Sequence, residues 1–488
     1  MERAIRHIVV AGGGITGWSA AAALRRRLPQ VAVTLVAMAP PEDALADRVS
    51  TTLPSIGGFH GDLGLSEADT VARAGSAFRL GSVFQGWTEG LPAYVHAYGT
   101  HGQAFGATSF HHQWVRAAKA GRAAAFDAFS PGAAMGRAGR FLHPRGEPGT
   151  PLASFEYGLE INTLRYAELL RAYGRHLGVE ERRADIVAVR LEGENGFVEA
   201  LDLSDGSAVE GDLFVDCTGP RALVRSKLDD AFVAWDQWLI CDRVAFGEAP
   251  PSPQLPVLDL VEATANGWRW QASAPHRTAV GIVFSSAAGA GAGGPGEGIA
   301  IRQGRRPQPW LKNCVAIGDS AVAVEPLEWT NLHLAHSFID RMIWMMPDRD
   351  CAAVELAEYN RQCEAEANRV RDFLVLHYAT AKRSEPFWRE AAAVTLPDSL
   401  EHTLTLFKER GRLPFHEEET FTRDSWLSVL LGQGVMPRRT DPLTETIPAE
   451  EAAQRMDLMR QTLDEMVGQI PPHAAYLQNF AARAGARR

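Results

Sequence analysis

The residues with the clearest chemical meaning lie near the N-terminus, in the run Gly12-Gly13-Gly14-Ile15-Thr16-Gly17. Its spacing fits G-x-G-x-x-G directly after a short apolar strand and at the head of an alanine-rich helix. Glycines permit a tight turn and let a pyrophosphate approach the helix N-terminus, where amide N–H groups and the helix dipole favour anions. We therefore expect a dinucleotide site formed by Gly12, Gly14, Thr16 and Gly17. A glycine turn without a ligand is the alternative.

A second chemical group is the carboxylate of Asp319, which follows Gly318 and precedes Pro326 in GDSAVAVEP. This spacing resembles the flavin-monooxygenase class of FAD proteins, in which the aspartate meets the ribityl chain. The segment DLFVDCTG, residues 212–219, resembles another strand and turn of that class. The three elements together predict FAD as the cofactor. For Asp319 alone, a helix cap is the alternative.

The second strand lacks the carboxylate that usually binds a ribose, because TLVAMAP places Ala37 there. A different group must then hold the ribose, or binding is weaker. We find a single G-x-G-x-x-G fingerprint in the sequence, so no NAD(P)H site is expected. Reduced flavin is therefore expected to arrive from a separate reductase.

Two tryptophans alternate in NGWRWQASAPHRTAVG, residues 266–281. The period of a strand places Trp268 and Trp270 on one face and Arg269 on the other. One interpretation is a sheet that buries two aromatic rings in its core. The other is an aromatic wall beside a reaction chamber.

The elements that must position these groups follow an α/β pattern. A strand is predicted at 31–40, a strand followed by a glycine turn in each of 211–224 and 312–331, and a helix capped by Asn162 at 161–179. We expect a Rossmann-type FAD-binding domain with an inserted mixed β-sheet for the substrate and a C-terminal helical region. The predicted limits are 1–345 for the discontinuous FAD domain, with insertions at about 60–150 and 225–300, and 346–488 for the helices that close the substrate side.

Composition restricts the class of protein. The 488 residues carry a net charge of −10 without a basic stripe, which argues against a nucleic-acid partner. The sequence has no apolar run long enough for a membrane helix, and the apolar part of the N-terminus is too short for a signal peptide. The five cysteines lack C-x-x-C spacing. We expect a soluble cytoplasmic protein with reduced thiols and no metal site.

With these elements placed, the chain resembles the flavin-dependent tryptophan halogenases over nearly its whole length. The tryptophan strand is similar to their WxWxIP segment, and AVEPLEWTNLHL to their EPLEST segment. Other similar segments follow in the same order: GGGITGWSAAAAL, AFRLGSVFQGW, FHHQW, LICDRVAF, GRRPQPWLKNCVAIG, GQGVMPRRTDPL and PPHAAYL.

The resemblance implies a reaction. FADH2 reacts with O2 to give a flavin hydroperoxide, halide attacks it to form hypohalous acid, and the acid travels through a tunnel to an electron-rich aromatic substrate such as an indole. A lysine holds the electrophilic halogen and a glutamate assists. A halide ion is therefore a co-substrate, and the assembly can be a homodimer.

The resemblance carries these roles to particular residues. Arg79 stands at the lysine's position and Glu328 matches the glutamate. The halide is expected near Thr330 and Asn331, where Asn331 replaces a glycine. Residues expected along the tunnel or substrate chamber are Trp268, Trp270, His111, Trp329 and Trp426.

Arg79 is the main departure from the family pattern. A guanidinium stays protonated and is a poor nucleophile, so a covalent N-halo species is not expected. Arg79 can still position hypohalous acid by hydrogen bonds, or it can form a structural ion pair with Glu328. The leading hypothesis is a halogenase. The alternatives are a flavin monooxygenase or oxidase without halogenation, and a flavin-binding protein without turnover.

Overall fold

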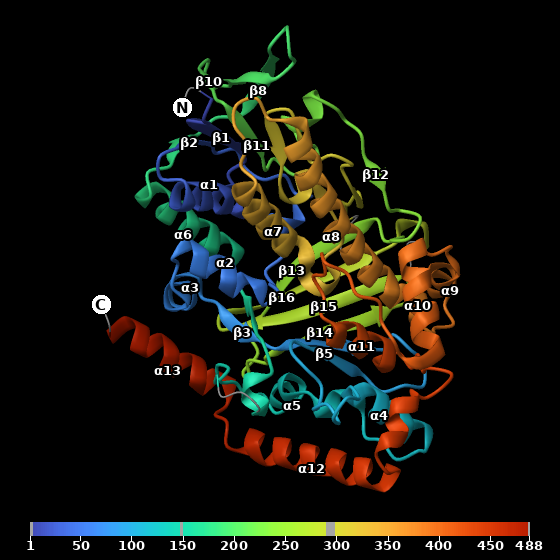
Figure 1. The fold of residues 1–488 in the computed structure, drawn as a ribbon. Coiled ribbons are helices and arrows are strands. Elements are labelled where there is room, and N and C mark those ends of the chain that lie inside the picture. The colour runs from blue at the N-terminus through green and yellow to red at the C-terminus, as the bar shows by residue number, and fades with distance from the viewer. Residues whose placement is uncertain (1–2, 147–149, 289–297, 487–488) are drawn as a thin grey trace.

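The N-terminal glycine turn belongs to a six-stranded sheet in the upper part of the molecule (Figure 1). The computed structural model describes residues 3–146, 150–288 and 298–486. The strand order is β19 (Trp310–Leu311), β20 (Cys314–Ala316), β11 (Leu213–Asp216), β1 (His7–Ala11), β2 (Ala32–Val36) and β7 (Glu180–Arg182). All neighbours pair in parallel except β19 and β20. This is a Rossmann-type sheet, with β1 and its glycine turn at its centre.

Three helices accompany this sheet: α1 (Ile15–Arg27), α6 (Thr163–His176) and α7 (Thr330–Trp344). Helix α1 contacts both α6 and α7. Its buried face is a run of alanines, 20–23, whose small side chains allow close packing. The side chain of Asn162 caps α6 by accepting from the backbone N–H of Arg165 at 3.1 Å, as the sequence predicts.

A seven-stranded mixed sheet forms the middle of the molecule (Figure 1). Its order is β17 (Ile299–Ala300), β13 (Arg243–Ala249), β16 (Arg277–Phe284), β15 (Gly267–Ala274), β14 (Leu258–Thr264), β4 (Gly81–Gln85) and β5 (Tyr94–Ala97). Only β14 and β4 pair in parallel among these strands of the described chain. The tryptophan strand, β15, therefore lies between β14 and β16, near the centre of the sheet.

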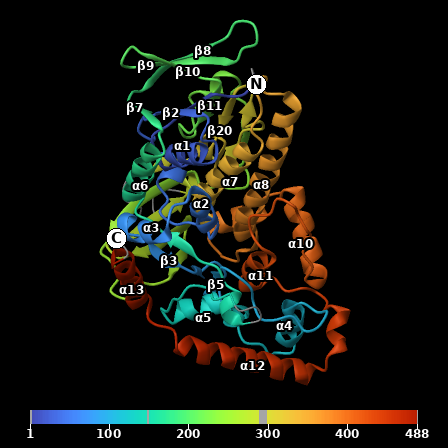
Figure 2. The same cartoon turned by 60° about the vertical axis from the view of Figure 1, so that its left-hand side comes forward.

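Helices dominate the chain after residue 345. They are α8 (Ala353–Thr380), α9 (Pro386–Ala393), α10 (Asp398–Arg410), α11 (Arg423–Gly432), α12 (Ala449–Gly468) and α13 (His473–Ala486). Helix α11 contacts β5, α12 contacts α5 (Pro131–Arg137), and α13 contacts α3 (Glu67–Ala74). Figure 2 shows α12 running below α4 (Phe110–Lys119) and α5. The C-terminal helices thus pack on the segment inserted between the early strands.

The remaining elements are smaller. They are α2 (Ser55–Leu63), β3 (Ala77–Arg79), β6 (Gly158–Glu160), β8 (Ile186–Leu191), β9 (Val198–Leu203), β10 (Ala208–Glu210), β12 (Val233–Ala234), β18 (Gly304–Arg305) and β21 (Val322–Ala323). Strands β8 to β10 form an outer three-stranded sheet at the top of the view (Figure 1). Within the described residues, no helix combines the length and apolar character that crossing a bilayer requires.

The predicted fold class is confirmed: a Rossmann-type sheet, an inserted mixed sheet and a helical C-terminal region are all present. The predicted domain limits stay a prediction, because the helices of the C-terminal region pack directly on the inserted segment.

Candidate active site

The glycine turn has the close packing that its spacing predicts. Gly12 has φ +117°, a conformation that side chains rarely adopt. A Cβ at Gly17 would lie 1.9 Å from the carbonyl oxygen of Gly12, so helix α1 can approach strand β1 only because position 17 is glycine. These two glycines hold the N-terminus of α1 at the carboxyl end of the strand.

A carboxylate of the protein itself lies on that helix N-terminus. The backbone N–H of Thr16 donates to Asp47 Oδ1 at 2.8 Å. A Cβ at Gly14 would lie 2.5 Å from the carboxyl carbon of Asp47. Burial raises the pKa of Asp47 to about 6, although hydrogen bonds from the α1 N-terminus oppose the rise. Asp47 was not among the predicted site residues.

Asp319 lies beside the same segment. Its Oδ2 accepts from the backbone N–H of Ala46 at 2.8 Å, and its buried Oδ1 has no partner among the described residues. Burial raises the pKa of Asp319 well above its usual range, and the charge of Asp47 adds to the rise. The neighbouring Gly318 has φ +64° and brings the carboxylate close to Thr16, whose methyl group would meet a Cβ at position 318.

These residues fit an FAD dinucleotide by their chemistry. An N-terminal helix turn suits a pyrophosphate, and the orphaned Asp319 Oδ1 suits a sugar hydroxyl. Asp47 lies on the helix N-terminus, at the position that suits such an anion. A cavity of about 400 Å³ adjoins this position, with Asp47, Arg48 and Trp270 among its lining residues.

The two tryptophans of β15 lie on the buried face of the sheet, and Arg269 lies on the exposed face. The Trp268 indole donates to Glu325 at 3.2 Å and to Tyr378 at 3.1 Å, which gives it a structural place in the core. The Trp270 ring lies over Gly281, where a Cβ would come within 2.0 Å of it. The two indoles therefore differ, because Trp270 alone also lines the cavity beside Asp47.

Trp270 connects that cavity to the predicted catalytic residues. Its ring centroid lies 6.1 Å from that of Trp329, and the Trp329 indole donates to Ser82 Oγ at 3.1 Å. The guanidinium of Arg79 lies 5.8 Å from the Trp329 ring centroid. An aromatic wall thus runs from the cofactor side of the sheet to Arg79.

Arg79 is fully buried and fully hydrogen-bonded. Its nitrogens donate to Asp259 Oδ2 at 2.7 Å, the Thr52 carbonyl at 2.9 Å, the Tyr98 hydroxyl, the Gly81 carbonyl at 3.2 Å and Ser82 Oγ at 3.2 Å. Burial favours a neutral guanidinium, yet the charge of Asp259 holds the pKa of Arg79 above its ordinary value. A guanidinium has five N–H groups, and these contacts use all of them.

The interpretation of Arg79 as the ion-pair partner of Glu328 is wrong. Arg79 pairs with Asp259 at 2.5 Å, and the described residues contain no ion pair between Arg79 and Glu328. Positioning of hypohalous acid by Arg79 would first require one of its present hydrogen bonds to break.

Glu328 lies between two histidines. The His96 ring donates from Nδ1 to Glu328 Oε1 at 2.8 Å, and His377 Nε2 donates to the same oxygen at 2.9 Å. Burial alone would raise the pKa of Glu328, but the charge of His96 and hydrogen bonds from both histidines lower it to about 2. Glu328 is therefore an ionised carboxylate inside the protein.

The two histidines of this cluster are held differently. His377 Nδ1 faces the carbonyl of Phe373 at 2.9 Å, so both of its ring nitrogens face oxygen atoms. His96 Nε2 is buried and has no partner in the part of the chain that the structure describes. Glu328 and Trp329 both have left-handed backbone conformations, with φ of 60° and 62°. Such residues are strained and persist where surrounding contacts fix them.

The predicted halide residues lie at the start of α7. Thr330 Oγ1 is buried without a partner among the described residues, and a hydroxyl can donate to an anion. Asn331 Nδ2 already donates to the carbonyl of Val324 at 2.8 Å, which leaves its oxygen, an acceptor, unpaired within the described chain. Of the two side chains, only Thr330 therefore has an unpaired hydroxyl that could donate to an anion.

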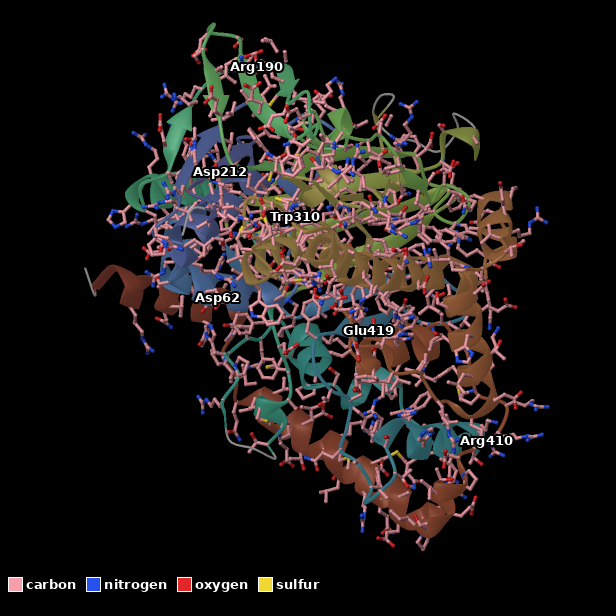
Figure 3. The ribbon with its side chains drawn as sticks, turned by 45° about the horizontal axis from the view of Figure 1, so that its top comes forward. Asp62, Arg190, Asp212, Trp310, Arg410 and Glu419 are labelled. Carbon is pink, nitrogen blue, oxygen red and sulfur yellow. The ribbon has the colours of Figure 1, made fainter. Side chains whose placement is uncertain are left out.

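The two remaining predicted residues lie farther from Glu328. His111 Nε2 donates to the carbonyl of Gly411 at 2.8 Å, and we find no contact from His111 to the Glu328 cluster within the described chain. Trp426 packs on Phe373 with ring centroids 5.0 Å apart and donates to Glu419 at 3.3 Å. Glu419 is labelled near the centre of Figure 3. Trp426 thus supports the ring that packs against both histidines.

A cavity of about 260 Å³ lies near His96, although neither Glu328 nor its two histidines line it. Tyr98 and Phe421 line it, and their ring centroids lie 6.1 Å and 6.3 Å from that of His96. Ser425, at the start of α11, lies on its other side.

Sequence reasoning missed four residues of this site: Asp47, His96, Asp259 and His377. The alternation in AYVHAYG places His96 between two tyrosines on one face of a strand, which is a usable signal. His377 and Asp259 sit in apolar runs, where a buried polar residue requires a partner. The partner itself could not be named from the sequence.

Comparison with known proteins agrees with this geometry. The family model described as tryptophan halogenase matches residues 7–449. The solved structure of BrvH, a flavin-dependent halogenase from Brevundimonas sp. BAL3, has a TM-score of 0.92 and 35% identity, covering 98% of this chain and 99% of that one. Xcc4156, a flavin-dependent halogenase from Xanthomonas campestris, has a TM-score of 0.91 and 32% identity at the same coverage.

A curated relative is similar over its whole length. Tryptophan 6-halogenase ThaL from Streptomyces albogriseolus is 25% identical, with 96% of this chain and 98% of the relative aligned. The family model and these relatives agree with the Rossmann-type site and its aromatic wall. The chain therefore belongs to the tryptophan halogenase family of flavin-dependent enzymes.

Proposed function

We propose that this enzyme uses reduced FAD, O2 and a halide ion to halogenate an electron-rich aromatic molecule such as an indole. Gly12, Gly14, Thr16, Gly17, Gly318 and Asp319 would hold the FAD, which supplies the oxidising chemistry when bound. A separate reductase would supply it in reduced form. The homodimer and the cytoplasmic location stay predictions.

The observation that carries the proposal is the buried, ionised carboxylate of Glu328. Substitution by an electrophilic halogen gives the aromatic ring a positive charge, and the ring must then lose a proton. A carboxylate in a site of low dielectric constant stabilises that charge strongly. His96 directs Nδ1 at Glu328 and leaves Nε2 unpaired within the described chain, which places that nitrogen to take up a proton beside a carboxylate that stabilises positive charge.

The cavity beside Tyr98 and Phe421 supports a small substrate. Ligand pockets usually span about 300–1,000 Å³, and this cavity, at about 260 Å³, is slightly smaller than that range. Tyr98 and Phe421 offer aromatic surface to a flat ring within a lining that is otherwise largely polar or aliphatic. We therefore infer an indole or phenol of low mass rather than a large peptide as the substrate.

Thr330 and the aromatic wall complete the proposed path. The Thr330 hydroxyl at the start of α7 would donate to the halide. Trp270 and Trp329 would line the route between the cofactor side and Glu328. Trp329 replaces a smaller family residue, so the route is narrow.

One observation favours a second function, namely oxygenation or oxidation without halogenation. All N–H groups of Arg79 have partners, so no donor is available at the position where the family holds the halogen. In that case the same site would transfer oxygen to the substrate or oxidise it.

The test is an incubation with FAD, a reductase, NADH, O2 and bromide or chloride, over a panel of indoles and phenols. Halogen isotope patterns in the products support halogenation. Products that gain only oxygen support the second function, and a fully uncoupled oxidation of FADH2 contradicts both.

The role of the cluster is tested by Glu328→Gln, which is expected to lower turnover at least a hundredfold. The matched control is Glu366→Gln, because Glu366 is also buried, is also held at a pKa of about 2 and bonds to His333 and Arg341 instead. Equal losses of turnover in both variants would contradict the role of Glu328.

A further inference from the structure

Residues 44–48 follow the second strand and enter the predicted cofactor site. Ala44, Leu45, Ala46 and Asp47 are all buried, and residues 45–47 form one turn of 3-10 helix. This turn contacts α1, α7 and the turn at Gly318–Ser320. It is thus packed between the two elements that the sequence assigns to the dinucleotide.

The segment contacts both polar groups of that site. Asp47 accepts from the Thr16 N–H at 2.8 Å, where a helix N-terminus would bind a phosphate oxygen. Ala46 donates its N–H to Asp319 Oδ2 at 2.8 Å, which leaves Oδ1 as the oxygen available to a sugar hydroxyl. The contact between Asp47 and position 14 leaves no room for a second anion.

The closed arrangement is electrostatically unfavourable. Burial raises the pKa of Asp319, and the charges of Asp47 and Asp43 raise it further. The charge of Asp47 also contributes to the raised pKa of the buried Cys217 thiol. Within the described chain, neither Asp47 nor Asp319 has an ion pair with a basic side chain. The neighbouring Arg48 donates instead to the carbonyl of Glu42. Buried carboxylates without a countercharge are costly, so the segment can be displaced.

We propose that residues 44–48 are a built-in competitor of the dinucleotide, in which Asp47 takes the place of the pyrophosphate until the segment withdraws. The proposal rests on FAD as the cofactor of the proposed function. It concerns only binding, and it requires no particular chemistry on the substrate.

The competitor lowers the apparent affinity for FAD. When only a fraction of the protein is open, the apparent Kd equals the intrinsic Kd divided by that fraction. Removing the carboxylate raises the open fraction, so FAD binds more tightly. A variant that loses a true ligand would instead bind FAD more weakly.

The experiment measures the Kd of FAD and of ADP, a dinucleotide fragment with the same pyrophosphate, by calorimetry. Asp47→Asn and Asp47→Ala are compared with the parent, and Glu42→Gln is the matched control because it removes the same charge from an exposed position of the same loop. Melting curves establish that each variant is folded. We expect Kd to fall at least tenfold in Asp47→Ala and to stay unchanged in Glu42→Gln. Asp47→Asn resembles the protonated carboxyl that favours the closed state, so its Kd should not fall.

A second readout is hydrogen exchange of the parent with and without ADP. The amide of Ala46, which donates to Asp319, should exchange faster when ADP is bound. An unchanged or higher Kd in Asp47→Ala overturns the inference and leaves the proposed function intact. If neither the parent nor Asp47→Ala binds FAD or ADP, both the inference and the proposed function fail.

Discussion

Removing either partner of the buried pair Arg79–Asp259 should destabilise the protein strongly. The Arg79 side chain is 2% exposed and that of Asp259 is 4% exposed, with 2.5 Å between nitrogen and oxygen. Breaking such a pair leaves an uncompensated buried charge, which costs about 3–5 kcal/mol. The cost of Arg79→Met should approach the upper end of this range, because the substitution also leaves the Thr52 carbonyl without its donor.

The double variant Arg79→Met/Asp259→Leu should recover much of that loss. Well-packed apolar residues often replace a buried ion pair with little net change in the free energy of unfolding. We expect the double variant to be at least about 2 kcal/mol more stable than either single variant. The control is Arg122→Met, which breaks a pair with Glu450 whose side chains are 62% and 72% exposed, and should cost at most about 1 kcal/mol.

Urea unfolding followed by tryptophan fluorescence measures these differences. Single variants within about 1 kcal/mol of the parent would refute the view that Arg79 is fixed by Asp259. A double variant that is no more stable than the single variants would refute it as well, because the loss would then come from packing alone.

Three further predictions concern other parts of the site. Gly17→Ala should lower the free energy of unfolding in urea by about 2 kcal/mol or more, because its Cβ would clash with the Gly12 carbonyl. Gly57→Ala is the control: it has open space at Cβ and should change that free energy by less than about 1 kcal/mol. The affinity for FAD should fall roughly tenfold from pH 7 to pH 5, because Asp47, with its raised pKa of about 6, holds a proton in the closed state and releases it on opening. In Asp47→Asn the FAD affinity should lack this dependence on pH. The same pH dependence in the variant and the parent would contradict the prediction. Trp329→Ser should lower the free energy of unfolding by about 3 kcal/mol in thermal or urea unfolding. It should also raise the amount of halogenated product per FADH2 oxidised. An unchanged yield would argue against Trp329 as the residue that narrows the route to Glu328.

The parts of the fold that sequence predicts well depend on local geometry. The glycine turn follows from the close approach of Gly17 to Gly12, which only glycine allows. The cap at Asn162 needs only its own helix. The alternation of Trp268 and Trp270 fixes which face of the strand is buried. In each case the local structure is determined by residues that are near one another in the sequence.

The site was harder to predict, because its pairs join distant segments. Asp259 lies 180 positions from Arg79, and His96 lies 232 positions from Glu328. A single sequence carries no information on which of many buried polar residues pair. The resemblance supplied the position of Glu328, but the partners of Arg79 depend on tertiary packing alone.

The left-handed backbone at Glu328 and Trp329 has a consequence for engineering this enzyme. Selection for heat resistance alone favours glycine or asparagine at positions with a left-handed backbone, because these residues adopt that conformation with less strain. At position 328 such a change removes the carboxylate. At position 329 it removes the buried indole, whose packing outweighs the strain that is relieved. The most heat-resistant descendants of this chain and its most active ones should therefore diverge at Glu328, and libraries for stabilisation should keep that residue constant.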